Sequence, residues 1–221
     1  MLWFSAFFVE LFILFLLSRQ LTRVLSYFFY RLTKSNKVTI SLLAFLFFPG
    51  TVVHELAHAV AAGLMGVRVG TIEFVPKVEG DHVKLGSVQI AHTDPIRRFL
   101  IGAAPFFVGT GLLLSLLFFA VQHNWFANLA ASIGIGYAVF EIGNTMFSSR
   151  KDMDGALELL VVVVTLIVIF YLLGIRVPAF NPNVILDQPL PQEVFKQGSF
   201  FLLLPLALDA IVIVLFRPHK R

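Results

Sequence analysis

The sequence predicts an all-α membrane protein with about six transmembrane helices and a small membrane-associated β-hairpin between the second and the third. Hydrophobic residues make up 58% of the 221-residue chain and charged residues 14%, against about 45–50% and about 25% in soluble domains. The apolar residues gather into six long runs, as membrane-spanning helices require. We expect a single domain over residues 1–221, with its core at 38–175 and the hairpin at 67–92.

The first apolar run covers residues 2–17 and is expected to remain in the membrane. It lacks the basic residues and the small-residue cleavage site of a secretory signal peptide. Residues 18–37 then carry five Arg or Lys, while apolar residues still recur at helical spacing. This pattern predicts either an amphipathic helix at the membrane surface or an extension of the first helix past the headgroups.

The second apolar run, residues 38–66, contains Pro49-Gly50, which predicts a kink or the start of a second helical piece. Residues 67–92 differ in character from their neighbours. Two arms rich in Val and Ile partly alternate with polar residues and flank a centre of Gly and charge. That arrangement predicts a β-hairpin.

Four further apolar runs follow the hairpin, at residues 95–121, 125–147, 155–174 and 199–216. The first of these holds small residues that allow close helix packing, namely Gly102, Ala103, Ala104, Gly109 and Gly111. A Pro- and Asn-rich stretch at 175–198 is expected to be a loop. Six spans would put both termini on one side of the membrane, and the distribution of Arg and Lys slightly favours the cytoplasmic side for the termini and the hairpin.

The chain has no cysteine, which excludes disulfides and thiolate metal sites, so a metal must be held by His, Asp or Glu. The net charge of +4 comes from basic residues that border apolar segments. These positions suit lipid headgroups and give no reason to expect a nucleic-acid partner. We therefore expect an integral, multi-pass protein of a bacterial or archaeal cell membrane with the lipid bilayer as its surroundings; no oligomeric state is predicted.

The second apolar run contains the pattern H-E-x-x-H, formed by His54, Glu55 and His58. Two histidines at positions i and i+4 lie on one face of a helix and can bind one zinc ion, while the glutamate can contact a zinc-bound water. A charged group at the centre of a membrane helix costs about 2.5–3.5 kcal/mol, which zinc coordination would offset. The alternative is a cluster of His and Glu side chains that hydrogen-bond between helices.

Zinc needs a third protein ligand and an open position for water. The acidic residues close to membrane depth are candidates, and they are Glu10, Glu141, Asp152, Asp154, Glu158 and Asp209. The acids near the start of the run at 155–174 also suit the N-terminus of a helix, which is the alternative reading for Asp152 and Asp154.

The segment FPGTVVHELAHAVAAG at 48–63, the hairpin, and GNTMFSSRKDMDGA at 143–156 together resemble the site-2 protease family of intramembrane zinc metalloproteases. The resemblance extends over residues 40–175. In that family the third zinc ligand is an aspartate in the motif N-x-x-P-x-x-x-x-D-G. Asn144 and Asp152 keep the spacing of this motif, although Phe147 replaces its proline and the Asp-Gly pair falls at 154–155.

The resemblance implies that His54, His58 and Asp152 bind one zinc ion, with Asp154 as the alternative third ligand. It also implies that Asn144 helps to hold substrate near the zinc, whereas a hydrogen bond between helices is the other interpretation. Glu141, one helical turn before Asn144, is a rival ligand.

The function implied is a zinc metalloendopeptidase that hydrolyses peptide bonds of membrane-spanning substrates in regulated intramembrane proteolysis. Glu55 would take a proton from water and pass it to the leaving amine. An exposed hairpin edge would pair with an unwound substrate, helped by the small residues Gly63, Gly66 and Gly70. Two alternatives remain: a membrane zinc endopeptidase of the prenyl-protein type, with a glutamate as third ligand, and a non-catalytic metal-binding membrane scaffold.

Overall fold

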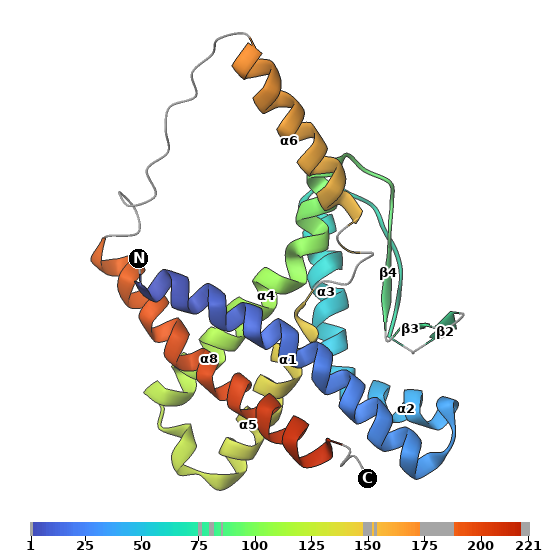
Figure 1. Cartoon of the computed structure of the whole chain (residues 1–221), viewed down its shortest axis with the longest axis vertical. Helices are drawn as coiled ribbons and strands as arrows, with labels where there is room; N and C mark the ends of the chain where they lie inside the picture. Colours follow the sequence, from blue (N-terminus) through green and yellow to red (C-terminus); the bar gives the residue numbers. More distant parts are fainter. Residues whose placement is uncertain are drawn as a thin grey trace.

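The structure, a computed structural model, describes residues 2–74, 77–79, 82–84, 86–147, 152, 154–172 and 188–217. These residues form long helices and two small antiparallel strand pairs (Figure 1). The predicted helical class and the small hairpin are therefore confirmed. Three described helices are long and apolar enough to cross a membrane, and a bent helix pair makes a fourth if it counts as one span. The predicted number of six spans is not confirmed.

Helix α1, Leu2–Thr33, joins the first apolar run to the basic segment after it. The extension of the first helix, rather than a separate surface helix, is what the structure contains. The helix ends before Lys34, whose φ of 53° is left-handed. Helix α2, Asn36–Leu46, begins two residues after Lys34. Ser35 caps its N-terminus, because the Ser35 side chain accepts a hydrogen bond from the Val38 N–H.

The second apolar run is broken, as the Pro49-Gly50 pair predicted. Helix α2 meets helix α3, Phe48–Leu64, at an angle of 70°. Pro49 lies in the first turn of α3, where a proline costs no helical hydrogen bond. The residue at the N-cap position, Phe47, makes no side-chain cap, so the first N–H groups of α3 depend on other parts of the chain.

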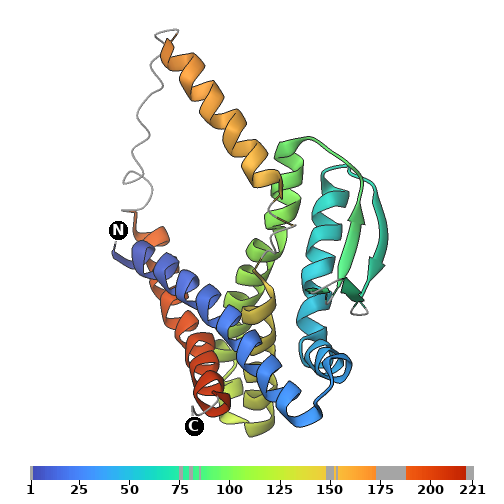
Figure 2. The same ribbon diagram turned by 45° about the vertical axis from the view of Figure 1, so that its right-hand side comes forward.

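The hairpin has two parts. Strands β1, Val69–Glu73, and β4, Ser87–Ile90, pair antiparallel at its base, with Ile72 opposite Val88 and an irregularity between Val69 and Ile72. Strands β2, Lys77–Glu79, and β3, His82–Lys84, pair at its tip. The base lies along α3 on the side away from helix α4 (Figure 2).

Helix α4, Pro95–Gln122, begins at a favourable cap. The side chain of Asp94 accepts a hydrogen bond from the backbone N–H of Arg97, which holds the pKa of that carboxyl below its usual value. After α4, Asn124 takes a left-handed φ of 53° and a short 3₁₀ turn, η1, covers Trp125–Ala127. Helix α5, Leu129–Thr145, therefore starts later than the apolar run at 125–147 suggested.

Helix α6, Asp154–Leu172, packs against α4 and extends beyond the bundle (Figure 1). The last helix, α8, covers Pro189–Phe216 and corrects the prediction of a loop at 175–198; residues 175–187 lie outside the described part. Pro189 is compatible with the start of a helix because it lies in the first turn. The polar residues are compatible with a helix too, since the Gln197 side-chain amide donates to Glu193 one turn earlier.

Helices α1 and α8 run parallel, with aromatic side chains between them. Phe4 packs on Phe195 near their N-terminal ends and Phe28 on Phe216 near their C-terminal ends. The start of α1 and the end of α8 therefore lie at opposite ends of the bundle (Figure 1). This parallel arrangement argues against the expectation that both termini lie on one side of the membrane, which stays a prediction.

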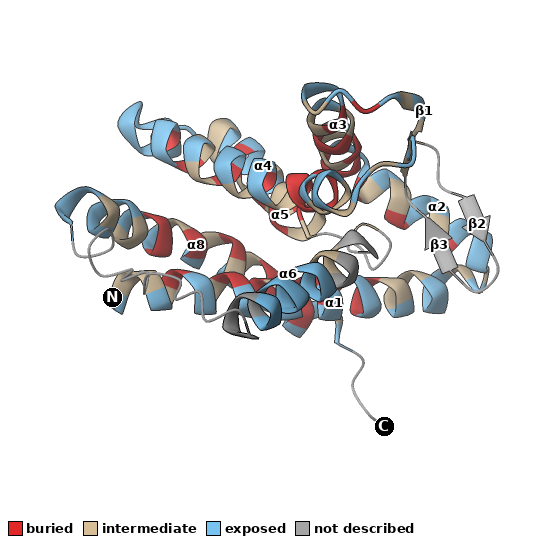
Figure 3. Cartoon of the chain, turned by 90° about the horizontal axis from the view of Figure 1, so that it is seen from above, coloured by how far each residue is buried: buried red, intermediate tan, exposed pale blue. Residues whose placement is uncertain are grey.

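The main core lies where α1, α4, α5 and α8 face one another, and Figure 3 shows the buried residues on these facing sides. Its fully buried members include Leu14, Leu113, Val139 and Leu202. Helix α3 stands at the edge of this core, between α4 and the hairpin. The expectation of a single domain stays a prediction.

Candidate metal centre

Helix α3 carries all three residues of the H-E-x-x-H pattern, and two of them are buried. Only 7% of Glu55 and 5% of His58 is exposed. The two imidazole rings lie one turn apart with their centroids 4.9 Å from each other and nearly perpendicular. Helical spacing therefore brings both rings to one place, as the sequence predicted.

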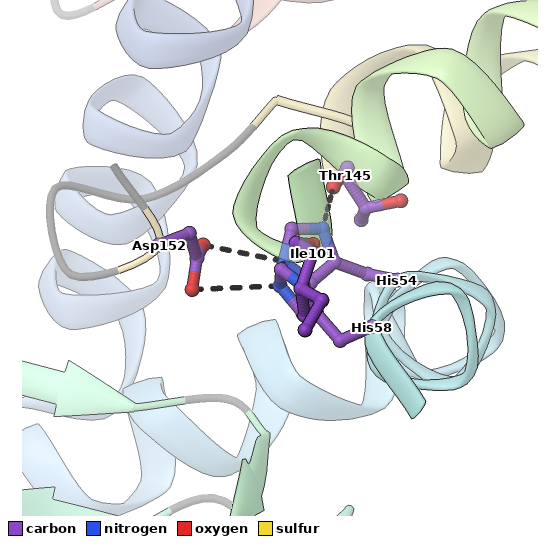
Figure 4. Close-up of polar contacts among 5 residues, drawn as sticks. All are labelled: His54, His58, Ile101, Thr145 and Asp152. Carbon is purple, nitrogen blue, oxygen red and sulfur yellow. Dashed lines mark hydrogen bonds and ion pairs between the residues drawn. The ribbon is translucent and has the colours of Figure 1, made fainter. Parts of the chain in front are cut away.

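Asp152 approaches both rings from the segment between α5 and α6 (Figure 4). His54 Nε2 lies 3.5 Å from Asp152 Oδ2, and His58 Nε2 lies 3.4 Å from Asp152 Oδ1. The two Nε2 atoms are 3.2 Å apart. Among the described residues, no other set of three His, Asp or Glu side chains gathers in this way.

The other nitrogen of each ring is bound to a backbone carbonyl. His54 Nδ1 lies 2.7 Å from the Thr145 oxygen on α5, and His58 Nδ1 lies 2.8 Å from the Ile101 oxygen on α4. A carbonyl oxygen only accepts hydrogen bonds, so both Nδ1 atoms carry the proton. In the neutral rings, both Nε2 atoms then present a lone pair.

Two unprotonated imidazole nitrogens and a carboxylate thus converge on one site, and all three groups are hydrogen-bond acceptors. Such a set repels itself unless a cation or added protons lie between its members. Zinc binds nitrogen and oxygen at about 2.0–2.2 Å in a tetrahedron, which separates its ligand atoms by about 3.4 Å. The two Nε2 atoms are 3.2 Å apart, close to this separation, and each lies 3.4 or 3.5 Å from a different oxygen of the Asp152 carboxylate. Hydrogen bonds from Nδ1 to carbonyls are typical of zinc-binding histidines.

Helix α5 is joined to the bent pair of α2 and α3 by three hydrogen bonds at regular intervals. The Tyr137 hydroxyl donates to the Leu46 oxygen at 3.1 Å, Glu141 Oε2 accepts from the Gly50 N–H at 3.0 Å, and the Thr145 oxygen accepts from His54. Each step is four residues on both sides. The Glu141 carboxyl thereby supplies the N-terminal cap that Phe47 cannot give to α3.

Two glycines of α4 allow the segment after α5 to come close. A β-carbon on Gly102 would overlap the backbone oxygen of Asp152, and one on Gly109 would overlap Met146 Cβ. The small residues at these positions thus allow close approach of the segment after α5, whereas the predicted close packing of helices is not what they show, and a β-carbon on Gly111 would meet nothing within 4 Å. Asp152 therefore reaches the histidines because residue 102 has no side chain.

The hairpin contacts the glutamate of the pattern. A β-carbon on Gly86, just before β4, would lie 2.9 Å from Glu55 Cγ and 3.0 Å from Glu55 Oε1. Of the three glycines predicted to let a substrate approach the hairpin, a β-carbon on Gly63 or Gly66 would meet nothing within 4 Å, while one on Gly70 would lie against Gln89 of the opposite strand. Their role toward a substrate stays a prediction, and Gly86 is the glycine that lies against Glu55.

The structure separates the candidate ligands. Asp152 joins the two histidines, while the Glu141 carboxyl binds the Gly50 N–H instead. The side chain of Asp154 lies outside the described residues. Asn144 does not join the triad: its side-chain amide donates to Asp209 on α8 at 2.7 Å. That contact is the interhelical hydrogen bond given as the alternative, and a role in substrate binding stays a prediction.

Sequence reasoning missed the groups that orient the ligands. The carbonyls of Ile101 and Thr145 are backbone atoms, so no residue type marks them. Gly86 and Gly102 carry no side-chain chemistry and are recognised only when their neighbours are known. Comparison with known proteins adds no relative, since no family model, no curated protein and no solved structure matches the chain.

Proposed function

We propose that the chain is a membrane-embedded zinc endopeptidase that hydrolyses peptide bonds of membrane-spanning proteins. The observation that carries this proposal is the convergence of three acceptor atoms, from His54, His58 and Asp152, beside a buried glutamate. The site-2 protease family, which the motifs resemble, performs this reaction with the same residue types.

The donor set suits zinc in number, type and spacing. Two imidazoles and a carboxylate are three protein ligands, which leaves a fourth position open for water or substrate. A zinc ion held there would polarise the carbonyl of the substrate peptide bond. It would also allow its bound water to deprotonate near neutral pH. The hydrogen bonds to Ile101 and Thr145 keep Nε2 of each ring free for the ion.

Glu55 is the residue that handles the proton in this proposal. It follows His54 directly on α3, so its carboxyl projects from the neighbouring face of the helix. Glu55 accepts a proton as water attacks the peptide carbonyl, and it then gives the proton to the leaving amine. Its 7% exposure limits competition from bulk water for those transfers.

Metal analysis and a cleavage assay on the purified protein test the proposal. Wild-type protein should hold about one zinc ion per chain and cleave a membrane-spanning peptide in detergent. Asp152→Ala should lose the zinc, whereas Asp154→Ala should keep it. Glu55→Gln should keep zinc but lose at least about a hundredfold in cleavage rate.

Other outcomes would favour the alternatives. Zinc loss in Glu141→Ala together with zinc retention in Asp152→Ala would favour a prenyl-protein-type endopeptidase, although the Glu141–Gly50 hydrogen bond argues against that ligand. Bound zinc with no cleavage of any membrane peptide by wild-type protein would favour a metal-binding scaffold. Unchanged cleavage by Glu55→Gln would contradict the proton role of Glu55.

The hairpin is the proposed site for an unwound substrate, which would add as a strand to β1 or β4. Thr71 on β1 and Gln89 on β4 are exposed positions in these strands. A proline at either position removes one backbone N–H from its strand. At least one of Thr71→Pro and Gln89→Pro should slow cleavage without loss of zinc, with the alanine variants as controls; unchanged cleavage by both would refute strand addition.

A further inference from the structure

The carbonyl that orients His58 lies inside a helix, where carbonyls normally have a helical partner. Ile101 is in the second turn of α4, and its oxygen lies 2.8 Å from His58 Nδ1. Both residues are buried, at 2% and 5% exposure. In a regular α-helix the oxygen of residue 101 accepts from the N–H of residue 105.

Residue 105 is a proline, which has no N–H to give. Pro105 lies in the interior of α4 and is fully buried. The proline ring also presses against the carbonyl four residues earlier and turns it out of the helical hydrogen-bond pattern. The Ile101 oxygen is therefore left without its helical donor at the position where α3 packs against α4.

A buried carbonyl without a donor is unfavourable, above all in a membrane. A buried imidazole N–H without an acceptor is unfavourable for the same reason. The contact between His58 and Ile101 satisfies both groups at once. It also fixes the ring tautomer, because the proton must lie on Nδ1 and the lone pair on Nε2.

We propose that Pro105 is a positioning residue for the metal centre. Because Pro105 has no N–H, the Ile101 carbonyl stays available to accept from His58 Nδ1. His58 Nε2 is then free to bind the ion. This inference rests on the metal centre of the proposed function. Gly102, which follows Ile101 on α4, lies against the Asp152 backbone. Neighbouring residues of α4 therefore position both His58 and Asp152.

A second proline provides a matched control. Pro205 lies in the interior of α8 and is also fully buried, but it packs near Gly143 of α5. Replacing it by alanine makes the same chemical change in the same kind of surroundings. None of the three candidate metal ligands lies on α8.

The test uses full-length Pro105→Ala in detergent. Zinc affinity is measured by competition with a coloured chelator, and thermal stability is measured on the metal-free protein. The N–H that the alanine introduces would compete with His58 for the Ile101 oxygen, so zinc affinity should fall about ten- to a hundredfold. Stability should be unchanged or higher, because alanine favours a helix interior more than proline does. Pro205→Ala should bind zinc as wild type does.

A second measurement separates positioning from packing and does not need the metal. Nitrogen-15 NMR of the histidine rings in metal-free protein, at a pH high enough for the rings to be neutral, should show His58 with its proton on Nδ1. In Pro105→Ala that preference should weaken, while it should persist in Pro205→Ala. Pro105→Gly restores the same N–H without a β-carbon, and it should repeat both results if the alanine variant folds poorly.

The outcomes distinguish this inference from the proposed function. Wild-type zinc affinity and an unchanged His58 tautomer in Pro105→Ala and Pro105→Gly would overturn the role of Pro105, whatever the peptidase activity. Weaker zinc binding in those variants, in a protein that cleaves no membrane peptide, would support the role of Pro105 and remove the proposed reaction. A wild-type His58 that carries its proton on Nε2 would also overturn the inference.

Discussion

His54 and His58 lie one turn apart on the same helix, yet they are held from opposite sides by different means. His54 donates to Thr145 at 2.7 Å, the last residue of α5, and His58 donates to Ile101 at 2.8 Å, within α4. The final carbonyls of any helix lack helical donors. The carbonyl inside α4 is free because Pro105 follows it by four residues.

Helices α4 and α5 also differ in the contacts that hold them against α3 and against the segment that carries Asp152. On the α4 side, glycine positions meet backbone or β-carbon atoms directly, as Gly102 meets Asp152. On the α5 side, Gly50 of α3 also lies close to α5, but the hydrogen bonds that join α5 to α3 and to the end of α2 come from the side chains of Glu141 and Tyr137. Backbone contacts cannot adjust without moving a helix, whereas side chains can change rotamer. Substitution of Gly102 should therefore have a larger effect than substitution of Glu141 or Tyr137.

The largest effect is expected for Gly102→Ala. The added β-carbon would overlap the backbone oxygen of Asp152, so the third ligand would have to move away from the histidines. Zinc affinity, measured by chelator competition, should fall at least about a hundredfold. Gly111→Ala is the matched control on the same helix, because its β-carbon would meet nothing within 4 Å. Equal affinities of the two variants would contradict the close contact at Gly102.

On the α5 side, Glu141→Ala should weaken zinc binding about ten- to a hundredfold. The change removes the acceptor of the Gly50 N–H, so α5 can shift along α3 and take the Thr145 carbonyl away from His54. Glu141→Gln keeps an acceptor oxygen and should bind zinc within about threefold of wild type. Glu10→Ala, which deletes an acid from α1, controls for the loss of a carboxyl. A glutamine variant as weak as the alanine variant would indicate that the charge, not the hydrogen bond, matters.

The sequence predicted that the side chains of His54, His58 and Asp152 lie together, but not the groups that orient them. The H-E-x-x-H spacing placed His54 and His58 on one face, and the family's motif spacing singled out Asp152 against Asp154. The grouping of His54, His58 and Asp152 agrees with these expectations, because helical periodicity and chain distance are local properties, while the choice of Asp152 over Asp154 as a ligand stays a prediction. The hydrogen bonds from the rings end on backbone oxygens of Thr145 and Ile101, which lie 91 and 43 residues away along the chain.

The errors in the fold have a physical cause as well. The Pro- and Asn-rich composition of 175–198 made the start of α8 resemble a loop, yet Pro189 lies in the first turn of the helix and Phe195 packs against α1. The predicted number of spans is not confirmed, and for the second apolar run it depends on whether α2 and α3, bent by 70°, count as one span, which hydropathy alone cannot reveal. Packing against other helices, which decides both points, is not readable from a local window.

A smaller effect, and a different one, is expected for Gly86→Ala. The added β-carbon would lie 3.0 Å from Glu55 Oε1, which would push the carboxyl but leave the histidines and Asp152 in place. The turnover number for peptide cleavage should fall about tenfold, since small misplacements of a catalytic group are costly. Zinc affinity should remain at the wild-type value. Gly63→Ala is the control, because that position is open. A loss of zinc in Gly86→Ala would show that the hairpin also supports the ligands.

The smallest effect is expected for Tyr137→Phe, which removes the hydrogen bond between α5 and the end of α2 that lies farthest from His54. The Tyr137 side chain is exposed, and its 3.1 Å bond ends on Leu46, at the end of α2 and on the far side of the bend from His54. Loss of one such bond should lower the free energy of unfolding by at most about 1 kcal/mol and change zinc affinity less than about twofold. Thermal unfolding and chelator competition measure the two quantities. If Tyr137→Phe weakened zinc binding as much as Glu141→Ala, the three bonds would act as one cooperative unit, and the α5 side would be as rigid as the α4 side.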